Sequence, residues 1–119
     1  MDDPLDARAL IVDAVFGRRR QDGMDPEDER ERRQRQSFLQ RLGREPIRLN
    51  SIEFRILAFL ASRPYRAFTR RRIVEAVSTQ HEPVTDSTLD QHITSLRDKL
   101  GFFRDYVQAV PYIGYRFKA

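Results

Sequence analysis

Residues 86–100 of the 119-residue chain read DSTLDQHITSLRDKL, and their pattern is the strongest indication of its architecture. At 100° per residue, their apolar positions fall within a sector of about 60°. The pattern predicts a helix with one core-facing stripe, made of Leu89, Ile93, Leu96 and Leu100. The opposite face carries small polar and amide side chains, namely Ser87, Gln91, Thr94, Ser95 and Asp98. Either Asp86 or Ser87 is expected to open this helix, and Gly101 to end it.

Two more helices are predicted before this stretch. Asn50 and Glu53 form a capping pair for a helix that ends before Pro64, because a proline disfavours helix at the residue preceding it. Thr69 is expected to cap the next helix. A polar loop over 78–85 then leads into the helix of residues 86–100.

Strands are expected at both ends of these helices. Residues 47–49 alternate like a short strand, and residues 106–110 and 114–117 are expected to pair as a hairpin around a turn at 111–113. A short strand, three helices and a closing hairpin is the order of a winged helix-turn-helix. Residues 44–119 are therefore predicted to form one α+β, mainly α, domain with that architecture.

Residues 1–43 differ in kind from the rest. An apolar run predicts a helix over 4–16, although its β-branched residues leave a strand as the alternative. A polar loop is expected over 18–25, and a capping signature at 25–26 opens a second helix that stops at Gly43. We expect a helical N-terminal extension that provides a homodimer contact through Leu5, Leu10, Ile11 and Val15, or through Phe38, Leu39 and Leu42.

Composition narrows the classes of function. The lack of cysteine excludes disulfides and thiolate metal sites. No apolar run reaches the roughly 18–20 residues of a membrane helix, and the start does not read as a signal peptide, so a cytoplasmic, nucleoid-associated chain without membrane contact is expected. The two histidines, His81 and His92, have no obvious partner in the sequence, and no phosphate loop or metal-ligand cluster is evident. No enzyme activity, cofactor or metal is predicted.

Positive charge is concentrated in residues 44–119, which contain 13 Lys and Arg and 8 Asp and Glu. Residues 1–43 contain 9 Lys and Arg and 10 Asp and Glu. Nearly all of the cations are arginines, whose planar fork of donors suits phosphate. Arg70, Arg71 and Arg72 occupy the first turn of a predicted helix, where the dipole disfavours cations by about 0.3–1 kcal/mol each. A bound phosphate would offset that cost, and simple solvent exposure is the alternative.

The segment over 47–117 resembles the DNA-binding effector domain of OmpR/PhoB-type response regulators. The stretches that carry the resemblance are LNSIEF (49–54), FTR (68–70), residues 86–100 quoted above and GYRF (114–117). The resemblance implies a transcription factor with a recognition helix over 87–100 and a wing over 106–117, often bound as a tandem dimer to direct repeats. It also implies that the loop over 78–85 faces RNA polymerase.

The sequence departs from that family in two respects. Residues 1–43 are too few for the phosphorylatable receiver domain, and the family's N-terminal sheet must be shortened or replaced by helices here. Neutral residues stand where relatives often carry basic ones, at Ser87, Thr94, Ser95 and Pro111.

These patterns, with the resemblance, predict sequence-specific binding of double-stranded DNA for transcriptional regulation. The helix over 87–100 is expected in the major groove and the wing over 106–117 on the adjacent groove or backbone. The residues expected to contact bases are Gln91, Thr94 and Ser95. Those expected to contact phosphates are Arg70, Arg71, Arg72, Ser87, Thr88, His92, Arg97, Lys99, Tyr112 and Lys118. The alternative is a winged-helix module that binds RNA polymerase or another regulator, because the recognition face is largely neutral. The dependence of binding on salt concentration distinguishes the two functions, because phosphate contacts make the affinity for DNA fall steeply with ionic strength.

Overall fold

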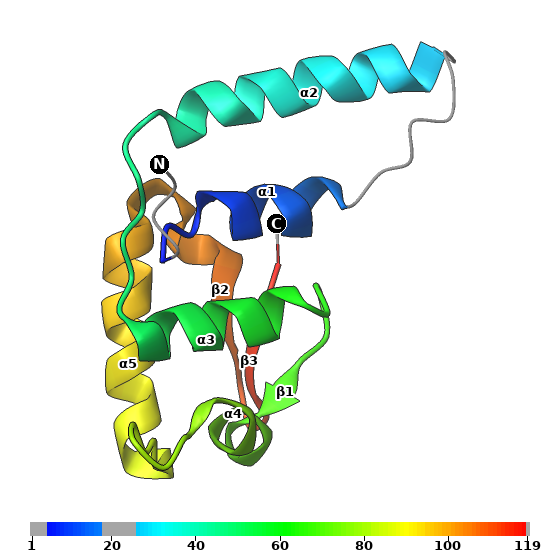
Figure 1. Cartoon of the computed structure of the whole chain (residues 1–119). Helices are drawn as coiled ribbons and strands as arrows, with labels where there is room; N and C mark the ends of the chain where they lie inside the picture. Colours follow the sequence, from blue (N-terminus) through cyan, green and yellow to red (C-terminus); the bar gives the residue numbers. More distant parts are fainter. Residues whose placement is uncertain (1–4, 18–25, 119) are drawn as a thin grey trace.

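The computed structural model describes residues 5–17 and 26–118, except for the side chains of 26–28 and 31 (Figure 1). The predicted loop over 18–25 lies outside the described residues. In chain order the elements are α1 (Arg8–Phe16), α2 (Pro26–Leu42), α3 (Ser51–Ala61), β1 (Phe68–Thr69), α4 (Arg70–Val77), α5 (Asp86–Leu100), the 3-10 helix η1 (Gly101–Tyr106), β2 (Val107–Val110) and β3 (Gly114–Phe117). Three helices followed by a hairpin confirm the winged helix-turn-helix architecture.

The three central helices begin where their capping residues predict. The side chain of Asn50 accepts a hydrogen bond from the Glu53 amide at 2.8 Å, and the Glu53 carboxylate accepts one from the Asn50 amide at 2.9 Å, which completes a capping box for α3. Thr69 accepts from the Arg72 amide at 3.1 Å and caps α4. Thr85 caps α5, so Asp86 is its first residue.

The sheet is small and antiparallel, with the strand order β1-β3-β2. β2 and β3 form the predicted hairpin, in which Val107 pairs with Phe117 and Val110 with Gly114. β1 adds two residues on the other side of β3, so Gly114 also pairs with Thr69. A Cβ atom on Gly114 would lie 2.1 Å from the carbonyl oxygen of Phe68, and glycine is therefore required for this close approach.

The core lies between the helices α3, α4 and α5 and the sheet. The predicted stripe of α5 is buried along its whole length, together with the inner sides of α3 (Ile56, Leu57 and Leu60) and α4 (Ile73 and Val77). Burial of these apolar side chains drives the packing of the three helices. It also fixes which side of α5 faces outward.

The N-terminal segment joins the same core. α1 is a helix rather than the alternative strand, and it begins at Arg8 instead of near residue 4. The expected strand over 47–49 is reduced to a single bridge between Asp6 and Arg48. The Ala7 amide donates to the Ile47 carbonyl at 2.9 Å, which ties the start of α1 to the segment before α3.

Aromatic side chains connect α2 with the C-terminal part of the fold. The Phe38 ring lies 5.3 Å from Phe16 of α1 and 5.2 Å from Phe103 of η1, measured between centroids. Tyr106 continues this contact to Phe117 of β3 at 5.9 Å. α2 is therefore held on the domain by its C-terminal half, while its described side chains at 29, 30 and 32–37 are exposed.

These contacts show which of the residues predicted for a homodimer contact are buried within the chain. Ile11 is 1% exposed and Phe38 is 9% exposed, so both side chains are used within the chain itself. Leu10, Val15 and Leu42 also pack against the core. Leu39 is the large apolar residue of the described part of α2 that remains substantially exposed.

Candidate functional site

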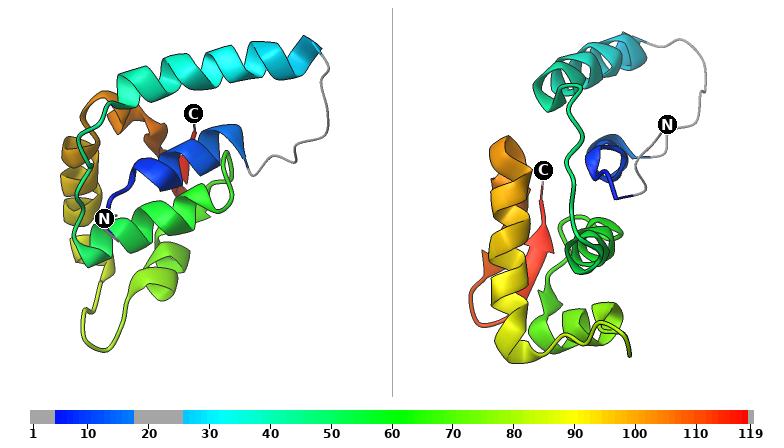
Figure 2. Two further views of the ribbon diagram at one scale, coloured as in Figure 1. Left: turned by 45° about the horizontal axis from the view of Figure 1, so that its top comes forward. Right: turned by 60° about the vertical axis from the view of Figure 1, so that its left-hand side comes forward.

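The outer side of α5 carries the side chains that the sequence predicts for recognition. Ser87, Gln91, Thr94 and Asp98 are exposed. The N-terminal half of α5 lies at the end of the molecule that also holds α4, away from α1 and α2 (Figures 1 and 2). The described part of the N-terminal segment therefore leaves this polar face open.

Ser95 and Lys99 do not belong to that face, because both bind the carboxylate of Glu53. Glu53 lies on α3 and is fully buried. The Lys99 ammonium donates to Glu53 Oε1 at 2.7 Å, and the Ser95 hydroxyl donates to Oε2. The predicted outward position of Ser95 is wrong, since its side chain is half-buried against α3.

The charge state of Glu53 follows from these contacts. Burial raises the pKa of the carboxyl, but hydrogen bonds from Lys99, Ser95 and the Asn50 amide outweigh burial and hold the pKa below its ordinary value. Glu53 is thus an ionised, buried group that joins α3 to α5. The capping pattern identified one of its partners in the sequence, but not the two that lie on α5.

Arg70 is held by a brace that links three elements. Its guanidinium pairs with Asp90 of α5, and the Tyr115 hydroxyl of β3 donates to the same carboxylate. Arg70 also lies over the Tyr115 ring, 5.8 Å from its centroid. Hydrogen bonds from Arg70 and Tyr115 lower the pKa of Asp90. Asp90 therefore joins α5 to α4 and to the hairpin.

The other two arginines of the predicted cluster remain accessible. The Arg71 side chain is 88% exposed and its nearest anion is Glu75, at 3.8 Å within the same helix. Arg72 is exposed and lies over the Phe59 ring, 5.7 Å from its centroid. The exposed ion pair between Arg71 and Glu75, at 3.8 Å, contributes little to stability. Arg71 and Arg72 are therefore accessible to an external anion at the start of α4.

The remaining predicted residues of α5 are less exposed. Thr88 is half-buried in the capping box with Thr85, and its hydroxyl accepts from the Thr85 amide at 3.0 Å. His92 is half-buried as well. Arg97 donates to the Arg104 carbonyl at 3.2 Å and pairs with Asp105 at 3.3 Å, so it braces η1 rather than facing the start of the helix.

The two residues predicted for the wing lie at opposite ends of the hairpin. Tyr112 occupies the turn and is fully exposed. Lys118 follows the last strand residue, and its amide donates to the Tyr106 carbonyl at 2.8 Å, beside the pair of Val107 with Phe117. Tyr112 and Lys118 therefore do not form one contact surface. Ile113, half-exposed next to Tyr112, is a surface residue that the sequence analysis did not single out.

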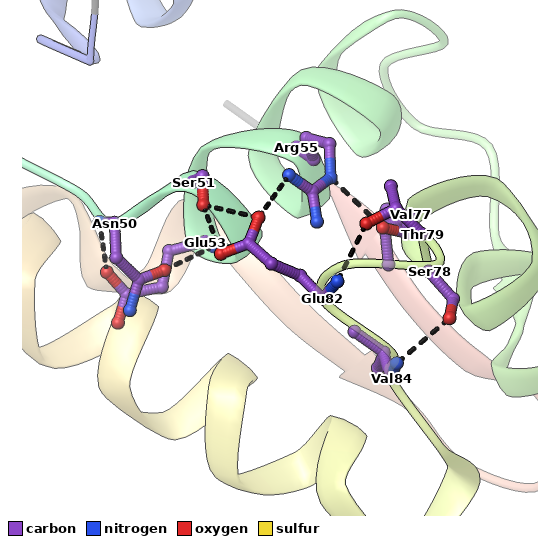
Figure 3. A network of polar contacts seen from close by, with 9 residues as sticks. All are labelled: Asn50, Ser51, Glu53, Arg55, Val77, Ser78, Thr79, Glu82 and Val84. Carbon is purple, nitrogen blue, oxygen red and sulfur yellow. Dashed lines mark hydrogen bonds and ion pairs between the residues drawn. The ribbon is translucent and has the colours of Figure 1, made fainter.

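The loop over 78–85 is anchored to α3 through Glu82 (Figure 3). The Ser51 hydroxyl lies 2.6 and 2.7 Å from the two Glu82 oxygens, and Arg55 donates to Oε1 at 2.9 Å. Arg55 also donates to the Val77 carbonyl at 3.0 Å. Hydrogen bonds from Ser51 and Arg55 lower the pKa of Glu82. The exposed residues that this anchoring presents are Thr79, Gln80, His81, Pro83 and Thr85.

Metal clusters and membrane-spanning helices are both absent from the described residues. Within 5–17 and 26–118, no three side chains of His, Cys, Asp or Glu gather in a group that could hold a metal ion. Over the same part of the chain, no helix combines the length and the apolar character needed to cross a membrane.

Comparison with known sequences finds one family. Residues 43–117 match the family described as "Transcriptional regulatory protein, C terminal". The chain is 35% identical over 74 residues to the transcriptional regulatory protein BaeR of Escherichia coli O6:H1, covering 60% of this chain and 31% of that protein. It is 36% identical over 77 residues to the phosphate regulon transcriptional regulatory protein PhoB of Escherichia coli K12, covering 63% and 34%. It thus spans about a third of the length of these relatives.

Two solved structures of response-regulator domains are also similar to this chain. The DNA-binding domain of the response regulator AdeR, in complex with an intercistronic region, matches with a TM-score of 0.54 and 25% identity over 63% of this chain and 76% of that one. The C-terminal domain of the nisin resistance regulator NsrR matches with a TM-score of 0.56 and 25% identity over 63% and 78%.

Proposed function

Because the chain belongs to the family of transcriptional regulatory protein C-terminal domains, it carries a DNA-binding winged-helix domain, and we propose that this domain reads a duplex with the outer side of α5 in the major groove. The observation that supports this placement most directly is the open polar face with Gln91 and Thr94 exposed at its centre. A glutamine can bond bidentately to adenine, and a threonine offers a hydroxyl to base edges and a methyl to thymine.

Phosphate contacts are proposed for the exposed groups that flank this face. Arg71 and Arg72 are exposed at the start of α4, and Ser87 offers an exposed hydroxyl in the first turn of α5. Arg70 is assigned to the brace with Asp90, where it sets the angle between α4 and α5. Asp98 would repel a phosphate, so the C-terminal half of α5 is proposed to leave the groove.

The roles of the rest of the chain are proposals of the same kind. We propose a binding protein without catalytic activity that works in the cytoplasm at the nucleoid. Loop 78–85, held in place by Glu82, presents a polar surface suited to RNA polymerase. We propose that a homodimer contact through residues 1–43 uses Leu39, which is exposed, whereas Ile11 and Phe38 are buried in the chain's own core.

Selection of preferred sites from random duplexes, followed by titration of variants, tests the DNA proposal. Gln91→Ala is expected to cost about 1–3 kcal/mol on the selected site and to relax preference at one base pair. Arg71→Ala is expected to weaken all duplexes alike and to reduce the salt slope by about one. Gln34→Ala and Arg33→Ala, the same changes at exposed positions of α2, are the matched controls.

The outcomes separate the two candidate functions. Binding that is indifferent to both salt and sequence would favour the protein-interaction module instead of DNA recognition. Equal effects of Gln91→Ala and Gln34→Ala would refute the placement of α5 in the major groove.

A further inference from the structure

The turn over residues 63–66, which connects α3 to β1, is held in a fixed shape. The Arg66 amide donates to the Arg63 carbonyl at 3.2 Å and closes the turn. The Tyr65 amide donates to the Phe117 carbonyl of β3 at 2.7 Å and fixes the turn on the sheet. Tyr65 has a φ of 72° and follows Pro64, which is the pattern of a type II turn with glycine as the usual residue at the Tyr65 position. An exposed tyrosine kept in such strain is typical of binding surfaces.

Two arginines of this region are held on aromatic rings. The Arg66 guanidinium lies over Phe68, 5.1 Å from the ring centroid, and the guanidinium of Arg72 in α4 lies over Phe59, 5.7 Å from its centroid. The two rings are in contact, with 4.5 Å between their centroids. Within the described residues, no ion pair is formed by Arg63, Arg66 or Arg72. A guanidinium that lies on a ring keeps its in-plane donors available for an anion such as a carboxylate.

A groove opens beside the same turn. It lies between α1 and α3 and encloses about 460 Å³. Its lining is mostly apolar and includes Leu10, Ala14, Ala58, Ala61 and Pro64, together with Asp13 of α1. Pro64 is also a residue of the turn, so an apolar side chain placed in the groove would lie next to Arg63. Cations and an apolar recess therefore adjoin on one surface.

The position and the lining of this surface favour a protein partner over nucleic acid. The C-terminal end of α3 lies across the domain from α5 in both drawings (Figures 1 and 2). The surface is therefore separate from the outer side of α5. A phosphate backbone offers charge but no apolar group that would fill the groove, whereas a peptide segment supplies carboxylates and apolar side chains from neighbouring positions.

We propose that the turn over 63–66 and the groove between α1 and α3 form a docking surface for a short acidic segment of another protein. Carboxylates of the segment pair with Arg63 and Arg66, and one large apolar side chain enters the groove next to Pro64. Asp13 on the α1 wall repels a further carboxylate, so the acidic residues of the partner are confined to the side of the turn. The surface requires α1, which lies outside the residues that match the family, and it does not depend on DNA binding.

Selection from a library of random displayed peptides, with the whole chain as target, tests this surface. The enriched peptides are expected to combine Asp or Glu with a large apolar residue, and one of them, synthesised and labelled, is the probe. The double variant Arg63→Gln, Arg66→Gln removes both charges and keeps most of both stems, and is expected to weaken binding of the probe about tenfold. Ala61→Leu fills the groove, leaves the arginines in place and is expected to weaken binding to a similar extent. The double variant Arg33→Gln, Arg35→Gln, at exposed positions of α2, is the matched control.

The docking surface is refuted if the enriched peptides lack acidic residues, if the α2 control weakens binding equally, or if Ala61→Leu binds the probe as the unsubstituted chain does. Where Ala61→Leu lowers the thermal unfolding midpoint, Ala58→Leu fills the same groove from the preceding turn of α3 and replaces it.

Duplex titration of the same variants separates this inference from the proposed function. Arg72 is kept in every variant because it is also a proposed phosphate contact, so affinity for the selected duplex is expected to stay unchanged. A smaller salt slope for the duplex in the variant Arg63→Gln, Arg66→Gln would show that the turn binds phosphate, and the docking surface would then be wrong. Failure of the chain to select any duplex would refute the proposed function alone, because the peptide assay contains no DNA.

Discussion

Replacing Lys99 with methionine leaves the carboxylate of Glu53 buried without its cation, and this substitution tests the polar contact that joins α3 to α5. The Glu53 side chain is 1% exposed, and the Lys99 ammonium lies 2.7 Å from it. Methionine has a similar length and keeps the apolar stem, so the change removes the charge and one hydrogen bond with little loss of packing.

The size of the effect follows from the exposure of the two partners. Leaving one member of a fully buried ion pair alone costs about 3–5 kcal/mol. The Lys99 side chain is 41% exposed, so water screens part of the attraction. We therefore expect Lys99→Met to lower the free energy of unfolding at neutral pH by about 2 kcal/mol, close to the value of a hydrogen bond to a charged group.

The pH dependence gives a second signature. In the unsubstituted chain the pKa of Glu53 lies below its ordinary value, so the group contributes stability that is present above about pH 4.3 and is lost as the pH falls through the lower folded-state value. In Lys99→Met, burial is no longer outweighed and the folded-state pKa is expected above the ordinary value. The variant then binds a proton more readily when folded, so its deficit in stability shrinks as the pH falls from neutral to about 4.3.

Urea denaturation at several pH values measures both signatures. Arg97→Met is the matched control, because it removes a cation from the same helix where the pair with Asp105 is exposed on both sides (36% and 83%). Such a pair contributes about 0–1 kcal/mol. The double variant Glu53→Gln, Lys99→Met should be more stable than Lys99→Met alone, because no buried charge is left unpaired. A loss in Lys99→Met that equals the control and does not change with pH would refute this reasoning.

Three further substitutions test other parts of the structure. Asp90→Asn should lower the free energy of unfolding by at most about 1 kcal/mol, because the side chains of the Arg70–Asp90 pair are 39% and 53% exposed, and it should speed up hydrogen exchange of the β3 amides. The unsubstituted chain should show the same loosening below about pH 4, because the lowered pKa of Asp90 keeps this carboxylate ionised above that pH. Gly114→Ala places a Cβ 2.1 Å from the Phe68 carbonyl oxygen and should cost about 1–3 kcal/mol by urea denaturation; an unchanged midpoint would mean that β1 does not approach β3 this closely. Phe38→Ala should cost about 3–5 kcal/mol in thermal unfolding and Leu39→Ala, at 41% exposure, far less; similar losses would show that α2 is not part of the core.

The elements predicted most accurately are those whose causes are local. α5 runs over the predicted residues because its leucine period and its first turn lie within the stretch itself, and Gly101 follows it directly. The side chains of Asn50 and Thr69 accept hydrogen bonds from amides three residues away, so both caps could be identified from the sequence without knowledge of the fold. The hairpin was predicted to within one residue from alternation and a turn.

The candidate site was predicted less accurately, because its side chains are assigned by distant partners. Ser95 lies beside Thr94 at the edge of the polar face, and a helical wheel cannot tell which of the two meets α3. Arg70 has the same sequence signal as Arg71, but Asp90 holds it from another helix. No periodicity encodes these pairings.

Sequence by itself thus determined the helices, the hairpin, the polar stripe of α5 and the family, since hydrophobic period, caps and turns depend on neighbouring residues. Tertiary structure decided which of those polar and charged side chains remain available. The ion pairs that occupy Lys99 and Arg70 join residues 46 and 20 positions apart, and the packing of α3, α4 and the sheet against α5 brings them together. Arg71 is exposed whereas Arg70 pairs with Asp90, because tertiary packing brings Asp90 close to Arg70 alone. The sequence around the two arginines does not show this difference.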